Sequence, residues 1–209
     1  MKLKPAFAIA LATLLAGTTS LPAQLATKEA SATSLADLKS NLQQLGAQVG
    51  VTMTALESLK GSASKSADMK NDLDAFNRSY GTLEKELDKT RTQAIAMKAK
   101  AKEHQEAWEK EVEGIQNPNL REKATDRLAD ARKQFQKIIE RGEDLRQVGT
   151  PFMADLKDVK TFLDIDPSQK AVATLSNSIW KLGNQSKTVK KRIDALVAQI
   201  DKALGTPAK

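Results

Sequence analysis

The chain contains no cysteine and only one histidine, His104. The lack of cysteine excludes disulfides, thiolate metal sites and a cysteine nucleophile. Aromatic residues are also scarce, at 4% of the composition, whereas hydrophobic residues as a whole make up 40%. A core with few rings and many Leu, Ala, Ile and Val side chains is typical of long helices rather than of a sandwich or a barrel.

The first 23 residues have the character of an export signal. Two lysines are followed by a short apolar run over residues 6–17, and small residues near Ala23 offer a cleavage site. The run is well short of the roughly 20 residues that a membrane-spanning helix needs. An uncleaved anchor is the alternative reading, and cleavage after Ser20 or Ala26 is also compatible with the pattern. We predict a periplasmic protein whose signal is removed near Ala23.

Apolar residues recur after residue 33 at alternating spacings of three and four. The large apolar residues on these heptad stripes are Leu35, Leu38, Leu42, Leu45, Val49, Leu56, Leu59, Met69, Leu73, Phe76, Tyr80, Leu83, Leu87, Met97, Trp108, Val112, Ile115, Leu128, Phe135, Ile138, Leu145, Phe152, Leu156, Val159, Leu163, Val172, Leu175, Ile179, Leu182, Val189, Ile193, Leu196 and Ile200. This heptad period predicts long helices that pack side by side and coil around each other with a left-handed twist. The sequence is interrupted near Gly61, at Asn117-Pro118 and at Asp164 to Pro167, where helices are expected to end. The expected segments are a signal at 1–23, a flexible linker at 24–33, helices at about 34–60, 66–116, 119–163 and 167–204, and a tail at 205–209.

The arrangement of these helices follows from the short connections between them. Such connections make neighbouring helices antiparallel, so the fold class is all-α, an elongated antiparallel helical bundle or coiled coil of four long helices. The first helix reaches along about half of the second. We therefore expect four helices side by side at the end near Gly61 and three at the end near Pro118. Ser34 is the expected N-cap of the first helix.

One soft point is expected where small residues face each other. Gly149 and Pro151 interrupt the third helix, and 183–186 is the weakest stretch of the fourth. We predict a kink or a thinned core there, with Trp180 packing into the space. The alternative is that paired small residues let the two helices approach closely.

No set of residues forms a convincing catalytic or metal site. A metal site in a helical bundle usually combines Glu-x-x-His motifs from two helices, but Ala101 stands three positions before His104 and there is no second histidine. Carboxylate pairs such as Glu84 with Asp88 and Glu109 with Glu113 lie among lysines on expected solvent faces. We predict a protein that is not an enzyme and has no metal or other cofactor. Trp108 and Trp180 are core aromatics or, as the less favoured reading, binding platforms.

The net charge of +7 is concentrated near the C-terminus, where residues 167–209 contain eight Lys or Arg and two Asp. A basic cluster on the last helix is a candidate contact patch. It comprises Lys181, Lys187, Lys190, Lys191 and Arg192. It is either a solvated face or an electrostatic contact for anionic lipid, a peptidoglycan-associated polymer or an acidic protein. Nucleic acid fits poorly because no aromatic platform is interleaved with these lysines.

Nearly the whole chain after the signal resembles the bacterial family catalogued as domain of unknown function 2959. The residues that carry the resemblance are Ala55 to Lys60, Asp72, Leu73, Tyr80, Trp108 to Glu111, Asn119 to Arg121, Leu128, Phe135, Pro151, Phe162, Leu163 and Ala171 to Leu175. The turn Asp164 to Gln169 departs from the Lys-His-Asn type sequence of relatives, and many relatives look like lipoproteins, which carry an anchoring cysteine. The resemblance implies a helical envelope protein and supplies no activity.

Three functions are compatible with these observations. The leading one is a non-enzymatic periplasmic helical protein that binds or scaffolds an unknown protein or envelope component through its long surface. The second is peripheral attachment to the anionic membrane surface through the basic last helix. The third is a holdase-like periplasmic chaperone. The heptads do not decide the oligomeric state.

Overall fold

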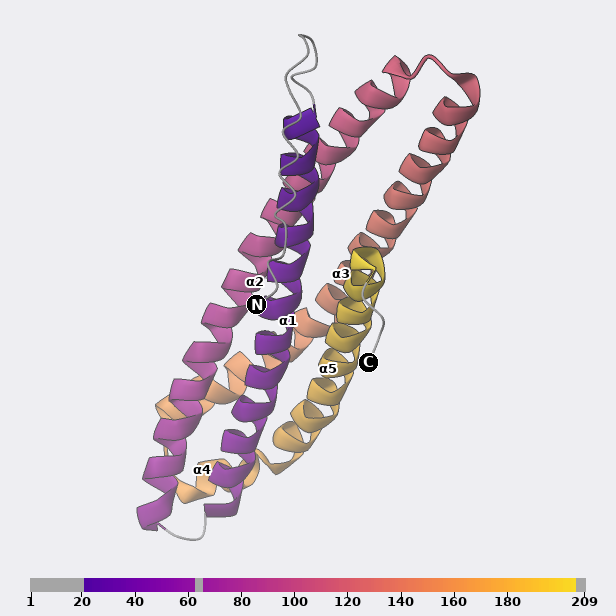
Figure 1. Ribbon diagram of the computed structural model, residues 1–209. Coiled ribbons are helices and arrows are strands. Elements are labelled where there is room, and N and C mark those ends of the chain that lie inside the picture. Colours follow the sequence, from indigo (N-terminus) through magenta and orange to yellow (C-terminus); the bar gives the residue numbers. More distant parts are fainter. Residues whose placement is uncertain (1–20, 63–65, 206–209) are drawn as a thin grey trace, which may run out of the picture.

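The computed structural model describes residues 21–62 and 66–205, and every regular element among them is a helix. The helices are α1 (Leu21–Ser62), α2 (Ser66–Gly114), α3 (Pro118–Ile165), α4 (Gln169–Thr174) and α5 (Ser176–Leu204). Figure 1 shows the long helices as an elongated bundle whose sequence neighbours run in opposite directions. The predicted all-α antiparallel bundle is confirmed.

The bundle consists of two helix hairpins that are joined mainly through α1. Helix α1 packs along α2 and also against α5, while α3 packs against α5 and less extensively against α2. The turn from α2 into α3 is set by Asn117, whose side-chain oxygen accepts from the backbone N–H groups of Asn119 and Leu120 at 3.0 and 3.2 Å. Pro118 occupies the first turn of α3, where its missing N–H costs nothing.

Helix α5 ends well before the α2–α3 turn, and this divides the bundle into two parts. Near the end of α5, Gln199 donates to Gln134 of α3 over 3.0 Å, and Asp201 forms a 2.5 Å ion pair with Lys39 of α1. The four-helix part therefore extends from the α1–α2 turn to the level of these contacts. Beyond it α2 and α3 continue without α5. The last helix, α5, is thus the short one, whereas the sequence analysis predicted that the first helix would reach along only about half of the second.

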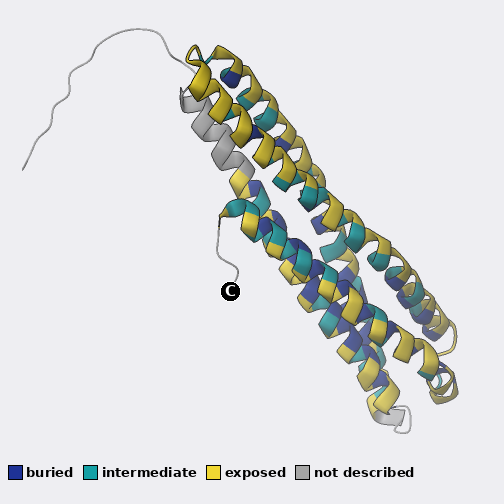
Figure 2. Ribbon diagram, turned by 90° about the vertical axis from the view of Figure 1, so that its right-hand side faces the viewer, coloured by how far each residue is buried: buried dark blue, intermediate teal, exposed yellow. Residues whose placement is uncertain are grey.

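The hydrophobic core is most continuous in the four-helix part, as the buried residues in Figure 2 show. Its largest fully buried side chains are Phe76, Phe152, Leu42, Leu56, Leu59, Leu83, Leu156, Leu163, Leu182, Ile193, Ile200 and Val49. All of them lie on the predicted heptad stripes, and together they come from α1, α2, α3 and α5. Burial of large apolar side chains is the main stabilising contribution in such a bundle.

Polar side chains inside the α1–α2 interface fix how the two helices align. Thr52 Oγ1 and Gln48 Nε2 of α1 both donate to the backbone carbonyl of Ser79 in α2, at 3.2 and 2.9 Å. Nearer the start of α1, Gln93 Nε2 donates to the carbonyl of Ser34 over 3.3 Å. Thr52 is completely buried, so its hydroxyl group depends on these partners in place of water.

The start of α1 differs from the sequence prediction. The helix begins at Leu21, so residues 24–33 are helical where a flexible linker was expected, and Ser34 is buried inside the helix and does not cap it. The segment is rich in alanine, and neither glycine nor proline occurs between Pro22 and Gly46, so no residue there breaks the helix, which continues to Ser62. Residues 1–20 of the predicted signal and 206–209 of the tail lie outside the described residues. Among the described helices, none is long and apolar enough to cross a membrane.

The predicted fourth helix is divided at Leu175. Ser168 caps the short helix α4 by accepting from the N–H of Ala171 over 3.1 Å. At the end of α4, the hydroxyl groups of Thr174 and Ser176 donate to backbone carbonyls three residues earlier, at 2.7 and 3.0 Å. The backbone N–H of Leu175 donates to the carbonyl of Val172, three residues earlier, at 3.1 Å, so a tighter turn separates α4 from α5.

The predicted soft point is only partly present. Helix α3 is continuous through Gly149 and Pro151, and Figure 1 shows that it changes direction along its length. Gly183 lies within a continuous α5. The prediction for Trp180 is wrong, because this side chain is 72% exposed and points away from the core. Ile179 and Leu182 occupy the buried face of that turn, and Trp180 falls on the opposite side.

Candidate binding site

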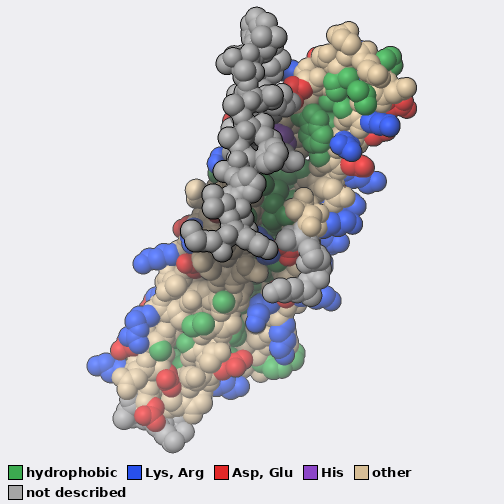
Figure 3. Space-filling model, in the orientation of Figure 1, with side chains coloured by type: hydrophobic (Ala, Val, Ile, Leu, Met, Phe, Trp, Pro, Cys, Tyr) green, Lys and Arg blue, Asp and Glu red, His purple; other side chains and the backbone are tan. Residues whose placement is uncertain are grey.

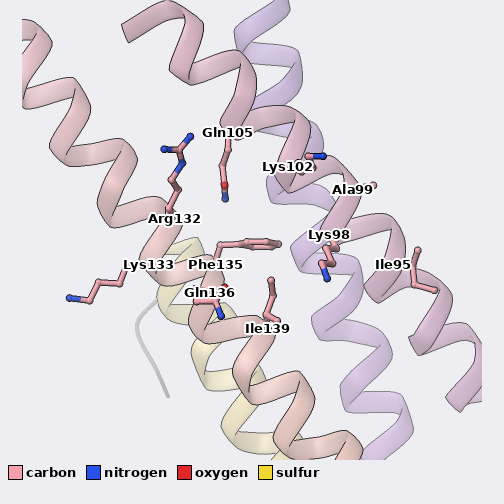
Figure 4. A pocket seen from close by; sticks show the side chains of 10 residues that line it. All are labelled: Ile95, Lys98, Ala99, Lys102, Gln105, Arg132, Lys133, Phe135, Gln136 and Ile139. Atoms are coloured by element: carbon pink, nitrogen blue, oxygen red, sulfur yellow. The ribbon is translucent and has the colours of Figure 1, made fainter. Parts of the chain in front are cut away.

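A groove lies between α2 and α3 in the part of the bundle near the end of α5. Its volume is about 920 Å³. It is lined from α2 by Ile95, Lys98, Ala99, Lys102 and Gln105, and from α3 by Arg132, Lys133, Phe135, Gln136 and Ile139. Figure 4 shows the ring of Phe135 reaching from α3 across the space toward α2, with Ile139 beside it. This volume is within the roughly 300–1,000 Å³ range of small-molecule sites.

The groove exists because α2 and α3 contact each other less extensively than the other neighbouring long helices do. Phe135 belongs to the heptad stripe of α3, yet it remains only half-buried. Ile95 and Ile139 stand beside the stripes, and Ile95 is 72% exposed. A large apolar side chain outside the stripe was the sequence signal for this surface, and the heptad analysis missed it. Hydrophobic side chains are also visible at the surface of the end that carries the α2–α3 turn in Figure 3.

The charged lining of the groove is entirely basic. Four of its ten residues are Lys or Arg and none is acidic. Two of the four have neighbouring carboxylates: Arg132 contacts Glu109 across the helices at 2.8 Å, and Lys102 contacts Glu106 at 3.7 Å. The Arg132–Glu109 pair ties α2 to α3 on the side of the groove nearer Pro118. No carboxylate among the described residues pairs with Lys98, which leaves its charge available to a ligand.

His104 lies near this region but belongs to a different environment. It is half-buried on α2, and its ring centroid is 5.8 Å from that of Trp108, with the planes tilted by 33°. The described residues contain no group of three or more His, Asp or Glu side chains that could hold a metal. The structure places His104 in an aromatic contact one turn from Trp108, which is itself half-buried.

The carboxylate pairs from the sequence have separate structural partners. Glu84 accepts a hydrogen bond from the hydroxyl group of Tyr80 over 2.9 Å. Burial, followed by the hydrogen bond and negative charge of Glu84, raises the pKa of Tyr80 to about 12. Asp88 pairs with Arg91 at 3.6 Å on an exposed face. These contacts are typical of helix surfaces and of a buried phenol that needs an acceptor.

The structure divides the predicted basic cluster on α5. Lys181 pairs with Asp155 of α3 at 2.7 Å, and Gln185 donates to the same carboxylate at 2.7 Å. These two hydrogen bonds lower the pKa of Asp155, with the positive charge of Lys181 adding to the effect. Arg192 lies 3.8 Å from Asp144.

The remaining three residues, Lys187, Lys190 and Lys191, are exposed on α5. No ion pair joins them to any carboxylate of the described helices. They line no part of the α2–α3 groove, whose basic residues come from α2 and α3. The chain therefore has two separate basic surfaces, of which the sequence identified one.

The fold and the groove together define a class: an extended, all-helical bundle with an open, basic-edged seam. The chain belongs to the family described as "Protein of unknown function (DUF2959)", whose model matches residues 39–207. The resemblance found in the sequence is thereby confirmed. No curated protein and no solved structure matches the chain.

Proposed function

We propose that this protein is a non-enzymatic binding protein of the cell envelope, and that it binds an amphiphilic envelope component in the α2–α3 groove. The observation that carries the proposal is the groove itself, which combines half-exposed apolar residues with basic side chains and no acidic ones. The apolar part of an amphiphile would cover Ile95, Phe135 and Ile139, and the basic side chains would hold its polar group. The N-terminal sequence supports export to the periplasm.

The test uses an amino acid with a small diazirine side chain, which leaves room for a ligand, placed at Ala99 in the groove, with Ala173 on α4 as the control position. Both alanines are exposed, so neither replacement disturbs the core. The protein is irradiated in living cells, recovered from the periplasmic fraction and weighed by mass spectrometry. We expect an adduct of small added mass at Ala99 and none at Ala173.

Equal labelling at the two positions, or none at Ala99, would show that the groove is not a binding surface. Recovery of the protein only from the cytoplasmic fraction would contradict export while leaving the groove result intact. The two parts of the proposal are therefore tested separately.

A second candidate function is attachment to the anionic membrane surface through α5. It is favoured by Lys187, Lys190 and Lys191, which are exposed and close together in sequence. Flotation with vesicles that contain phosphatidylglycerol should weaken when the three lysines become glutamates. Unchanged flotation, or flotation equally strong with neutral vesicles, removes this candidate.

A further inference from the structure

The lining of the α2–α3 groove specifies the chemistry of its ligand more closely than the proposed function does. One wall carries Lys98 and Lys102, which are four residues apart and therefore lie on the same face of α2. The opposite wall presents Phe135 and Ile139 of α3, also four residues apart, together with the basic residues Arg132 and Lys133. Ala99 lies between the two lysines and adds no bulk to the space.

We infer that the groove binds a long-chain carboxylate, the ionised form of a fatty acid. The inference rests on the proposed function and names its ligand class. Lys98 and Lys102 would hold the carboxylate, while the alkyl chain would lie against Phe135 and Ile139. Charge complementarity excludes a cationic amphiphile, because all four ionisable residues of the lining are basic.

The length of the groove fits an extended alkyl chain. The α2 side of the groove extends from Ile95 to Gln105, which at a rise of 1.5 Å per residue is about 15 Å. The seam runs along the two helices, so an extended alkyl chain can lie along it beside Phe135 and Ile139. A single chain also buries the two apolar side chains that the fold leaves half-exposed.

Binding can be measured with cis-parinaric acid, a fatty acid whose fluorescence rises in an apolar environment. The purified full-length protein is titrated with the acid and, separately, with its uncharged methyl ester. We expect the acid to bind more tightly than the ester, and we expect oleate to displace it.

Two variants test the apolar part of the site. Ala99→Trp fills the groove and should weaken binding of the acid by about tenfold or more, since it removes most of the volume near the lysines. Ala173→Trp makes the same change at an exposed position of α4 and should have no effect. Both positions are exposed, so matching circular dichroism and unfolding midpoints are expected for the two variants and the parent.

Two double variants test the charge. Lys98→Gln with Lys102→Gln should weaken binding of the acid by about twofold to thirtyfold, the range for two exposed ionic contacts, and should leave the ester unaffected. Lys187→Gln with Lys191→Gln removes the same charge from α5 and should change neither. Equal effects of the two double variants would mean that only net charge matters, and this would overturn the inference.

Other results overturn the inference without touching the proposed function. If the ester binds as well as the acid, the ligand is uncharged. If a lysophospholipid displaces the probe much better than oleate does, the headgroup is a phosphate. In both cases the adduct at Ala99 persists, so groove binding stands and only the ligand class is wrong. Absence of both probe binding and the Ala99 adduct refutes the two together.

Discussion

Tyr80 offers a direct test of the packing between α2 and α3. It is the only tyrosine in the chain, so any phenol titration reports this residue alone. Its side chain is 3% exposed, its ring lies 6.3 Å from that of Phe76, and its hydroxyl group donates to Glu84 over 2.9 Å. The ammonium group of Lys160 on α3 is 6.0 Å from the ring centroid. The phenolate would have to form beside a carboxylate and away from water, which disfavours it.

The size of the effect follows from the pKa. Burial and the neighbouring Glu84 raise the pKa of Tyr80 from 10.0 to about 12 in the folded protein. A difference of about two units corresponds to about 2–3 kcal/mol of unfolding free energy. Because the folded pKa is the higher one, this contribution is fully present below pH 10.0 and is lost as the pH rises from 10.0 to about 12.

The assay follows the phenolate absorbance in the near ultraviolet as the pH is raised, in buffer and in denaturing urea. We expect a midpoint near 10.0 in urea and near 12 in buffer, unless alkaline unfolding intervenes and exposes the ring earlier. Urea titrations below pH 10.0 and midway to 12 should show the corresponding loss of stability. A midpoint near 10.0 for the folded protein would refute the burial of Tyr80.

Replacing Glu84 separates the two causes of the shift. Glu84→Gln keeps an acceptor but removes the charge, so the pKa of Tyr80 should fall below that of the parent and stay above 10.0, because burial is the larger cause. Glu103→Gln changes an exposed carboxylate elsewhere on α2 and should leave the titration unchanged. A larger shift from Glu103→Gln than from Glu84→Gln would contradict the observed hydrogen bond.

Three further predictions concern stability and exposure. Leu156→Ala should lower the free energy of unfolding by about 2–5 kcal/mol because Leu156 is fully buried, whereas Leu120→Ala, at a side chain 56% exposed on the same helix, should change it by less than about 0.5 kcal/mol in urea titrations. Asp155→Asn should cost no more than about 1 kcal/mol at neutral pH, since its ion pair is partly exposed. Because the pKa of Asp155 is lowered in the folded protein, this difference in stability from the parent persists above pH 3.8 and disappears as the pH falls through the pKa of the folded protein. A stability difference that grows in acid would be inconsistent with the ion pair. In single-tryptophan variants, acrylamide should quench Trp180 more strongly than Trp108, and the reverse order would mean that Trp180 is packed after all.

The heptad pattern predicted the core because burial in a long helical bundle depends almost entirely on period. Leu42, Val49 and Leu56 of α1 were placed on the stripe by spacing alone, and all three are buried. The helix ends at Asn117-Pro118 could also be predicted from the sequence, since a capping side chain followed by proline is a local signal. Local chemistry and period together therefore account for the helices and for most of their buried faces.

Features that depend on how the helices are placed relative to each other could not be predicted from the sequence in this way. The break at Leu175 is a tight turn in which its N–H donates to the carbonyl of Val172, and heptad spacing gives no sign of it. No local signal gives the level at which α5 stops beside α3, near Gln134. The groove depends on how far α2 and α3 separate, which is set by tertiary packing. Ile95 and Ile139 lay outside the stripes and were the sequence indications of this surface.

The hydrogen bonds to the carbonyl of Ser79 have a consequence for folding specificity. Leucine heptads alone hardly distinguish one register of two packed helices from another, because a shift of seven residues again places apolar side chains against apolar side chains. Gln48 and Thr52 favour one alignment, because a shifted hairpin would deprive the Gln48 amide of its acceptor on α2 and would leave Thr52 only the carbonyl of Gln48 within its own helix. These few hydrogen bonds between α1 and α2 thus favour one alignment of the first two helices.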